Sequence, residues 1–169
     1  MTLSTVTRQE ILNFVAEKLH EQGQVSNRLD NTGNLQCAYR GFDLDHPEKT
    51  LKCAIGHLIP TKAYDRMMDD YSMSVLEMQR SIDKEKLDGL SKEAFQPDGE
   101  QFLYFLQRAH DLIPPDAKGL AFDAHLATNI RSRVLNKFTD LTLPKILQDI
   151  MDDPKNQKEL SQIDLLPSW

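Results

Sequence analysis

Cysteine is scarce in this chain, with two among 169 residues, and there is a single tryptophan. Two cysteines cannot form the disulfide framework that staples small secreted domains. No apolar run approaches the roughly 20 residues needed to cross a bilayer, and the first residues show no basic segment followed by an apolar one. We therefore expect a cytoplasmic protein that does not act at a membrane.

Positive charge is also in deficit, because 20 lysines and arginines face 26 aspartates and glutamates, for a net charge of -6. Nucleic acid is bound nonspecifically by basic surfaces, so direct nucleic-acid binding is not expected. The hydrophobic fraction of 40% is enough to bury a core. Length predicts a single domain over 1–169, with a weak subdivision near 89–99 as an alternative.

Familiar catalytic motifs are absent from the sequence. It contains no P-loop, no G-x-G-x-x-G after a predicted strand, no H-E-x-x-H and no G-x-S-x-G. Composition and motifs thus favour a protein that is not an enzyme, and they indicate no cofactor.

Apolar spacing predicts a mainly helical chain. Thr7 and Glu10 have the spacing of a capping box, and Gly23 is placed to end the helix that follows. Further helical patterns cover about 61–71, 74–87, 100–113, 122–138 and 142–153. In the 122–138 pattern the apolar residues recur at every fourth position: Phe122, Leu126, Ile130, Val134 and Phe138.

The segment 37–60, CAYRGFDLDHPEKTLKCAIGHLIP, holds both cysteines and two of the five histidines. Its ends are apolar and its middle is polar with a proline, which predicts two short strands joined by a long loop centred near His46. The turn formers in 25–36 predict a loop. The expected fold is mainly α with a small β-hairpin, a single compact α+β domain of five to six helices.

Residue parity predicts which side chains of this segment meet. Cys53 and His57 share a face whether the segment is a strand or a helix, because four positions apart satisfies both periods. In a hairpin centred near His46, Cys37 lies opposite Ile55 and faces the same side. Both sulfurs and the His57 imidazole are therefore expected to gather on one inward side of the hairpin.

Three interpretations of this group remain open. The cysteines can be small core hydrophobes, as free cysteine usually is. They can form a zinc site with the set Cys37, His46, Cys53 and His57, although the C-x2-C pairing typical of such sites is missing. Alternatively, Cys53 can be a nucleophile with His57 as its base. A Cys37–Cys53 disulfide is sterically allowed but disfavoured in a reducing cytoplasm.

The stretches "CAYRG", "KCAIGHLIP" and "YDRMMDD" resemble a group of small uncharacterised bacterial and phage proteins. Those proteins share a C-x-Y-R-G segment followed by C-A-[IV]-G-x-[LI]-I-P and a helix with tyrosine and methionine. The resemblance covers roughly residues 16–70, and the loop "FDLDHPEKT" is longer here. It implies a bacterial or phage protein in the cytoplasm, with no activity or site residue to transfer.

The leading functional hypothesis is therefore a non-enzymatic accessory protein that binds a protein partner. Tyrosine and arginine carry much of the energy of protein interfaces, so the expected contacts are Tyr39, Arg40, Tyr64 and Tyr71. Asp65 and Asp69, four apart on the same predicted helix, can also hold a hard cation such as magnesium, although such pairs are usually just solvated.

Overall fold

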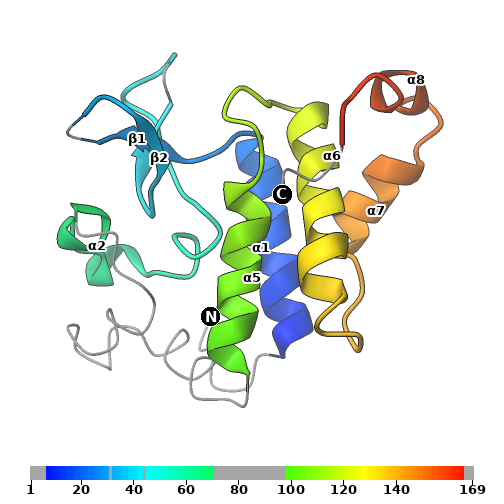
Figure 1. Ribbon diagram of the computed structural model, residues 1–169, viewed down its shortest axis with the longest axis horizontal. Coiled ribbons are helices and arrows are strands. Elements are labelled where there is room, and N and C mark those ends of the chain that lie inside the picture. The colour runs from blue at the N-terminus through cyan, green and yellow to red at the C-terminus, as the bar shows by residue number, and fades with distance from the viewer. Residues whose placement is uncertain (1–6, 31, 44, 71–97, 166–169) are drawn as a thin grey trace.

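The computed structural model describes residues 7–30, 32–43, 45–70 and 98–165. Within these residues the chain forms six helices and a four-stranded antiparallel sheet, so the expected α+β fold is confirmed. The four longer helices form a bundle beside the sheet (Figure 1): α1 (Arg8–Gln22), α5 (Gly99–Asp111), α6 (Leu120–Asn129) and α7 (Lys145–Asp152). The shorter ones are α2 (Met67–Asp70) and α8 (Gln157–Leu160). The helix expected over 74–87 lies outside the described residues.

Helix α1 begins and ends where its sequence predicts. The Thr7 hydroxyl accepts the N–H of Glu10, while the Glu10 carboxylate accepts the N–H of Thr7 at 2.7 Å, so the capping box is complete. At the other end, Gly23 has a φ of 67° and donates its N–H to the carbonyl of Leu19. One side of the helix is buried in the core through Ile11, Leu12, Val15, Ala16 and Leu19.

Helix α6 continues into a π-helical segment, η3 (Ile130–Leu135). All five residues of the every-fourth pattern are almost fully buried, with exposures from 0% to 7%. In an α-helix four residues turn by roughly 400°, so such a stripe drifts by about 40° at each step. The wider π-turns drift in the opposite sense. The change of helix type therefore keeps the apolar stripe against the core.

The sheet is larger than predicted and has the order β2-β1-β3-β4. Its strands are β1 (Asn27–Leu29), β2 (Leu35–Cys37), β3 (Gly41–Phe42) and β4 (Thr50–Leu51). Strands β3 and β4 pair Gly41 with Leu51, which confirms a hairpin centred near His46. Cys37, however, pairs with Asn27 of β1, so its predicted place in that hairpin is wrong.

The predicted loop over 25–36 is instead a second hairpin, made of β1 and β2. A carboxylate closes its tip: Asp30 Oδ1 accepts the N–H groups of Thr32 at 2.8 Å and Asn34 at 2.9 Å. Aspartate is frequent in turns because its side chain can satisfy nearby backbone donors in this way. The turn formers therefore mark a real turn, but the three-residue strands on either side are too short to show a period.

The segment after β4 is also not the strand that was predicted. The N–H of His57 donates to the carbonyl of Cys53 at 3.1 Å, as in one turn of a helix. A Cβ on Gly56 would lie only 2.2 Å from the carbonyl oxygen of Tyr39, so this turn packs backbone to backbone against the end of β2. Short apolar runs do not separate strand from helix by periodicity, which explains the error.

The helix predicted over 61–71 is broken in its described part. Thr61–Ala63 forms a single 3-10 turn, η2, and Tyr64 is extended with ψ of 131° before α2 begins at Met67. No helix in the described ranges has the length and apolar character required to pass through a bilayer.

Candidate functional site

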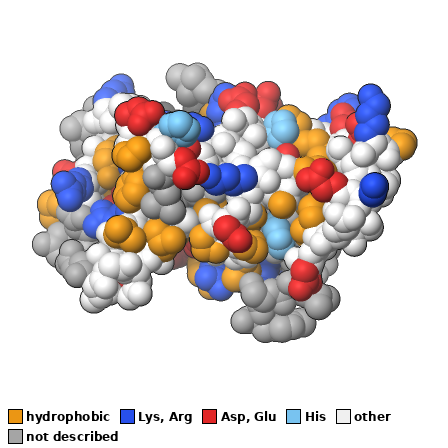
Figure 2. Space-filling model, turned by 90° about the horizontal axis from the view of Figure 1, so that it is seen from above, with side chains coloured by type: hydrophobic (Ala, Val, Ile, Leu, Met, Phe, Trp, Pro, Cys, Tyr) orange, Lys and Arg blue, Asp and Glu red, His pale blue; other side chains and the backbone are white. Residues whose placement is uncertain are grey.

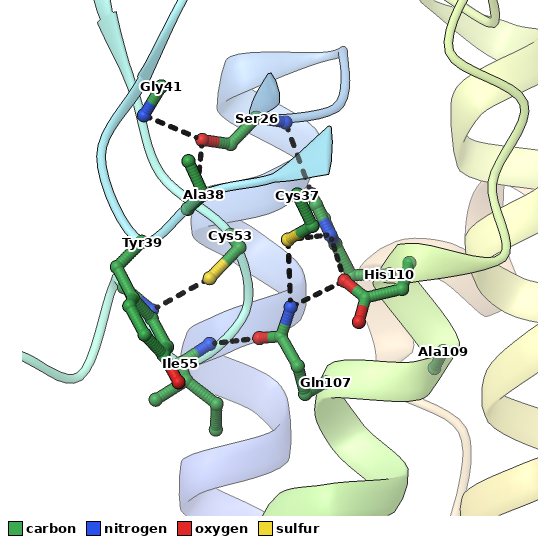
Figure 3. A network of polar contacts seen from close by, with 12 residues as sticks. Ser26, Cys37, Ala38, Tyr39, Gly41, Cys53, Ile55, Gln107, Ala109 and His110 are labelled. Atoms are coloured by element: carbon green, nitrogen blue, oxygen red, sulfur yellow. Dashed lines mark hydrogen bonds and ion pairs between the residues drawn. The ribbon is translucent and has the colours of Figure 1, made fainter. Parts of the chain in front are cut away.

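A thiol, an imidazole, a carboxylate and an amide meet where the sheet packs on α5 (Figure 3). Cys37 reaches this place from β2, and Gln107, His110 and Asp111 reach it from the last turn of α5. The Sγ atom of Cys37 lies 3.8 Å from His110 Nδ1, which in turn lies 3.3 Å from Asp111 Oδ1. Among the described residues, Cys37, His110 and Asp111 form a group of donors close enough to hold a metal ion.

Gln107 is the residue that joins the sheet, the turn and the helix. Its Nε2 donates to Cys37 Sγ at 3.1 Å and to Asp111 Oδ1 at 2.5 Å. Its Oε1 accepts the backbone N–H of Ile55 at 3.0 Å. Every polar atom of this side chain thus has a partner on a different segment, so the amide fixes the arrangement.

The second nitrogen of His110 decides what the imidazole can do. The backbone N–H of Ser26 donates to His110 Nε2 at 3.3 Å, and the ring is 1% exposed. A neutral imidazole has one protonated nitrogen, so accepting at Nε2 places the proton on Nδ1. His110 therefore presents an N–H, not a lone pair, to Asp111 and Cys37.

The same hydrogen bonds set the charges of the cluster. A hydrogen bond with the Cys53 side chain, together with burial, raises the pKa of the Cys37 thiol. Burial acts to raise the pKa of Asp111 as well, but hydrogen bonds from His110, Cys37 and Gln107 outweigh it and the net pKa is lowered. At neutral pH the site therefore holds a carboxylate surrounded by donors and a protonated thiol.

This arrangement does not favour a thiol nucleophile. A general base must accept the thiol proton, and an imidazole that is already protonated on the facing nitrogen cannot do so. It also does not favour zinc, because a metal at Nδ1 would require Nε2–H to face the Ser26 N–H. The geometry matches a buried hydrogen-bonded cluster whose members satisfy one another.

Of the residues singled out from the sequence, Cys53 and His57 share one helical turn, in which the His57 N–H donates to the Cys53 carbonyl at 3.1 Å. Cys37 and Cys53 lie on facing segments (Figure 3), and the Cys53 side chain acts to raise the pKa of the Cys37 thiol. His57 has a buried Nε2 without a hydrogen-bond partner among the described residues, and burial lowers its pKa to about 4. His46 is exposed and lies 3.7 Å from Glu48. His110 of α5, whose Nδ1 lies 3.8 Å from Cys37 Sγ, is a neighbour that the sequence did not indicate.

The residues that were expected to contact a partner protein make contacts within the chain. Asp69 is 5% exposed and accepts the backbone N–H groups of Tyr39 at 2.7 Å and Arg40 at 3.1 Å. The Tyr64 hydroxyl donates to the same carboxylate at 2.7 Å, and the Arg40 guanidinium stacks on the Tyr64 ring at 5.1 Å. These residues hold α2 against the sheet. Tyr71 lies outside the described residues.

Asp65 and Asp69, the pair suggested for magnesium, each accept hydrogen bonds from a different part of the chain. Asp69 is buried and used by backbone donors, whereas Asp65 caps the start of α2 by accepting the N–H of Met67 at 2.9 Å. The two carboxylates therefore serve different local structures.

Gln107, His110 and Asp111 were missed because the sequence gives them no metal or catalytic spacing. The one available signal is their position on α5: residues 107 and 111 are four apart and lie on one helical face. That signal does not identify β2 as their partner, since the strand joins them through contacts 70 or more residues apart in the chain.

The surface adds a second feature, an apolar pair on the outer hairpin. Leu29 and Leu35 are directly opposite each other on β1 and β2, and their side chains are 51% and 41% exposed. Figure 2 shows hydrophobic side chains exposed over the sheet half of the molecule, and positive and negative charges mixed across the same face. Among the described residues, that face carries no continuous basic stripe.

Comparison of the chain with protein-family models, with curated proteins and with solved structures finds no match. The resemblance to small bacterial and phage proteins therefore stays a prediction.

Proposed function

We propose that the protein is a non-enzymatic interaction protein that binds an extended segment of a partner protein along strand β2. The observation that carries the proposal is the exposed pair of Leu29 and Leu35 beside the edge strand β2. The setting is the bacterial or phage cytoplasm that the sequence resemblance implies.

The register of the hairpin shows which backbone groups of β2 face outward. Ala38 donates its N–H to Ser26, and Asp30 donates to Asn34, so these are hydrogen-bonded pairs at the two ends of the ladder. Hydrogen-bonded and non-hydrogen-bonded pairs alternate along antiparallel strands. Leu35 is therefore in a non-hydrogen-bonded pair, and its N–H and C=O point away from β1.

An extended peptide is the occupant that fits such an edge. Its own backbone can pair with the outward groups of β2, and apolar side chains at alternate positions can cover the exposed leucines. Within the described residues β2 is paired on one side only. Exposed apolar edges favour aggregation and are usually protected, so an edge that the described residues leave unpaired supports a binding role.

The buried cluster supports the proposal at the other end of the strand. Cys37, the last residue of β2, is held by Gln107 of α5. A strand fixed in this way loses little conformational freedom when a peptide is added, which favours binding.

The test selects binding peptides from a random displayed library on the purified full chain and measures their affinities. The variant Leu29→Ser/Leu35→Ser is expected to weaken the selected peptides by about tenfold or more. The matched control is Gln36→Ser, because Gln36 lies on the opposite face of β2 and its backbone bonds to β1. That control is expected to bind like the wild type.

Amide hydrogen exchange locates the peptide independently. Binding is expected to protect the amide of Leu35, which faces outward, and to leave that of Gln36 unchanged. Peptides that bind the wild type and the Leu29→Ser/Leu35→Ser variant equally, and that protect other amides, would contradict the proposal. A concentration-dependent dimer abolished by the leucine variant would also contradict it, since the edge would then belong to a second copy of the chain.

A further inference from the structure

We propose that Cys37 and Cys53 form a reversible intramolecular disulfide, so that the pair is a site of oxidative modification. The two thiols belong to separate segments, β2 and the turn that follows β4. This inference stands on the sulfur pair alone and does not depend on partner binding at the edge of β2.

Backbone packing brings the two cysteines together. The turn at 53–57 lies against the end of β2 so closely that only glycine fits at position 56. Gln107 then ties both segments to α5, because its amide nitrogen bonds Cys37 and its oxygen bonds Ile55. Figure 3 shows the two cysteines on facing segments, and the Cys53 side chain raises the pKa of the Cys37 thiol more than any other group does. The fold therefore holds two free cysteines on packed segments without a bond between them.

The two sulfurs differ in access. Cys53 is 0% exposed, and its sulfur accepts the backbone N–H of Gly56 at 3.3 Å. Cys37 is partly exposed. An oxidant from solution therefore reaches Cys37 first, and Cys53 is placed to complete the reaction.

The oxidant is a small-molecule disulfide, and the exchange proceeds in two steps. The Cys37 thiol loses its proton to solvent and attacks one sulfur of the small disulfide, which releases one small thiolate and leaves a mixed disulfide on Cys37. Cys53 then loses its proton and attacks the Cys37 sulfur, which releases the second small thiolate. The protein gives up two electrons and two protons, and one small disulfide becomes two small thiols.

The surroundings predict a slow reaction that speeds up in alkali. The hydrogen bond with Cys53 and burial raise the pKa of Cys37, so little thiolate is present at neutral pH. In a reducing cytoplasm the pair stays as two thiols, and it becomes oxidised only when the ratio of small disulfide to small thiol rises.

The experiment equilibrates the folded full chain with mixtures of oxidised and reduced glutathione, quenches with acid and measures the intact mass. The expected product is a monomer lighter by two hydrogens, in which a peptide map without reductant joins the peptides of Cys37 and Cys53. Adding excess dithiothreitol is expected to restore the original mass.

Single variants identify the order of attack. Cys53→Ser is expected to accumulate a glutathione adduct on Cys37, whereas Cys37→Ser is expected to remain unmodified while folded. A wild-type protein that keeps a stable glutathione adduct, forms disulfide-linked dimers or stays fully reduced at the most oxidising ratio would overturn the proposal. Because the wild type alone gives the main result, a variant that fails to fold leaves the test intact.

Discussion

The backbone N–H of Ser26 donates to Nε2 of His110 across 3.3 Å, between the residue that precedes β1 and the last turn of α5. The same serine uses its hydroxyl to bond the carbonyl of Ala38 at 2.8 Å and the N–H of Gly41 at 3.0 Å. One small residue thus fixes the sheet to the helix and the protonation of the imidazole. The chemistry available to the thiol cluster depends on this contact.

The first prediction concerns the tautomer of His110. The proton is expected on Nδ1, because Nε2 is used as an acceptor. Nitrogen-15 spectra of the imidazole at neutral pH measure this directly, and the exposed His46 serves as an internal reference. Zinc added at one equivalent is expected to leave the His110 signals unchanged. A shift to a metal-bound Nδ1 would show that the cluster is a metal centre after all.

The second prediction concerns Gln107. Gln107→Met keeps the size of the side chain but removes three hydrogen bonds, and it leaves the buried N–H of Ile55 without its partner. A loss of about 2–3 kcal/mol in the free energy of unfolding is expected. Urea denaturation measures the loss. The matched control is Gln162→Met, an exposed position whose effect is expected to stay within about 0.5 kcal/mol. Equal effects at both positions would contradict a joining role for Gln107.

The third prediction concerns the Asp69 carboxylate and the groups that donate to it, and it distinguishes a structural role from a role in partner binding. Asp69→Ala removes the acceptor of two backbone N–H groups and the Tyr64 hydroxyl, and should cost about 2–4 kcal/mol of stability. Tyr64→Phe removes one of these bonds and should cost about 1 kcal/mol. Thermal or urea unfolding gives both values. Variants that keep full stability but lose peptide binding would show that Tyr39, Arg40 and Tyr64 contact the partner, as the sequence predicted.

The fourth prediction is a pH dependence due to His57, whose pKa is lowered by burial to about 4 from an ordinary 6.5. The folded state then binds a proton less tightly than the unfolded chain does. The neutral ring makes its full contribution to the free energy of unfolding above about pH 6.5. That contribution is lost as the pH falls from 6.5 towards 4. Discounted for partial exposure of the ring, the loss should be about 1–2 kcal/mol.

The comparison that isolates this effect is the difference between wild type and His57→Gln, measured by urea unfolding at a series of pH values. The variant is expected to lose the part of the acid dependence that lies between pH 6.5 and 4, while His46→Gln at an exposed site keeps it. Parallel curves for the wild type and His57→Gln would show that the ring protonates freely in the folded protein.

Local signals in the sequence predicted the local parts of this fold. The capping box at Thr7 and the glycine at position 23 define α1 because each depends on contacts within a few residues. The hairpin around His46 was found for the same reason. Turn chemistry was recognised at Asp30, but three-residue strands leave too short an alternation to be seen.

The candidate site could not be predicted from the sequence, because it is made by packing between segments that are far apart in the chain. The approach of the segments that carry Cys37 and Cys53 was predicted, although by way of a hairpin pairing that does not exist. His57 was chosen over His110 because nearness in the sequence was the only guide. The contact between β2 and α5 depends on how the whole sheet lies on the bundle, and no spacing in a single sequence records it.

The π-helical segment η3 makes the type of helix at this point a structural requirement. If the same six residues, Ile130–Leu135, formed an ordinary α-helix, every turn would be tighter and everything that follows would rotate further about the helix axis. The ring of Phe138 would then leave its edge-to-face contact with Phe102, whose centroid lies 5.5 Å away. A one-residue deletion within η3 can be absorbed by a return to α-helix, because five α-helical residues turn the chain about as far as six π-helical ones, whereas the same deletion within α6 would rotate the path into α7 by about 100°.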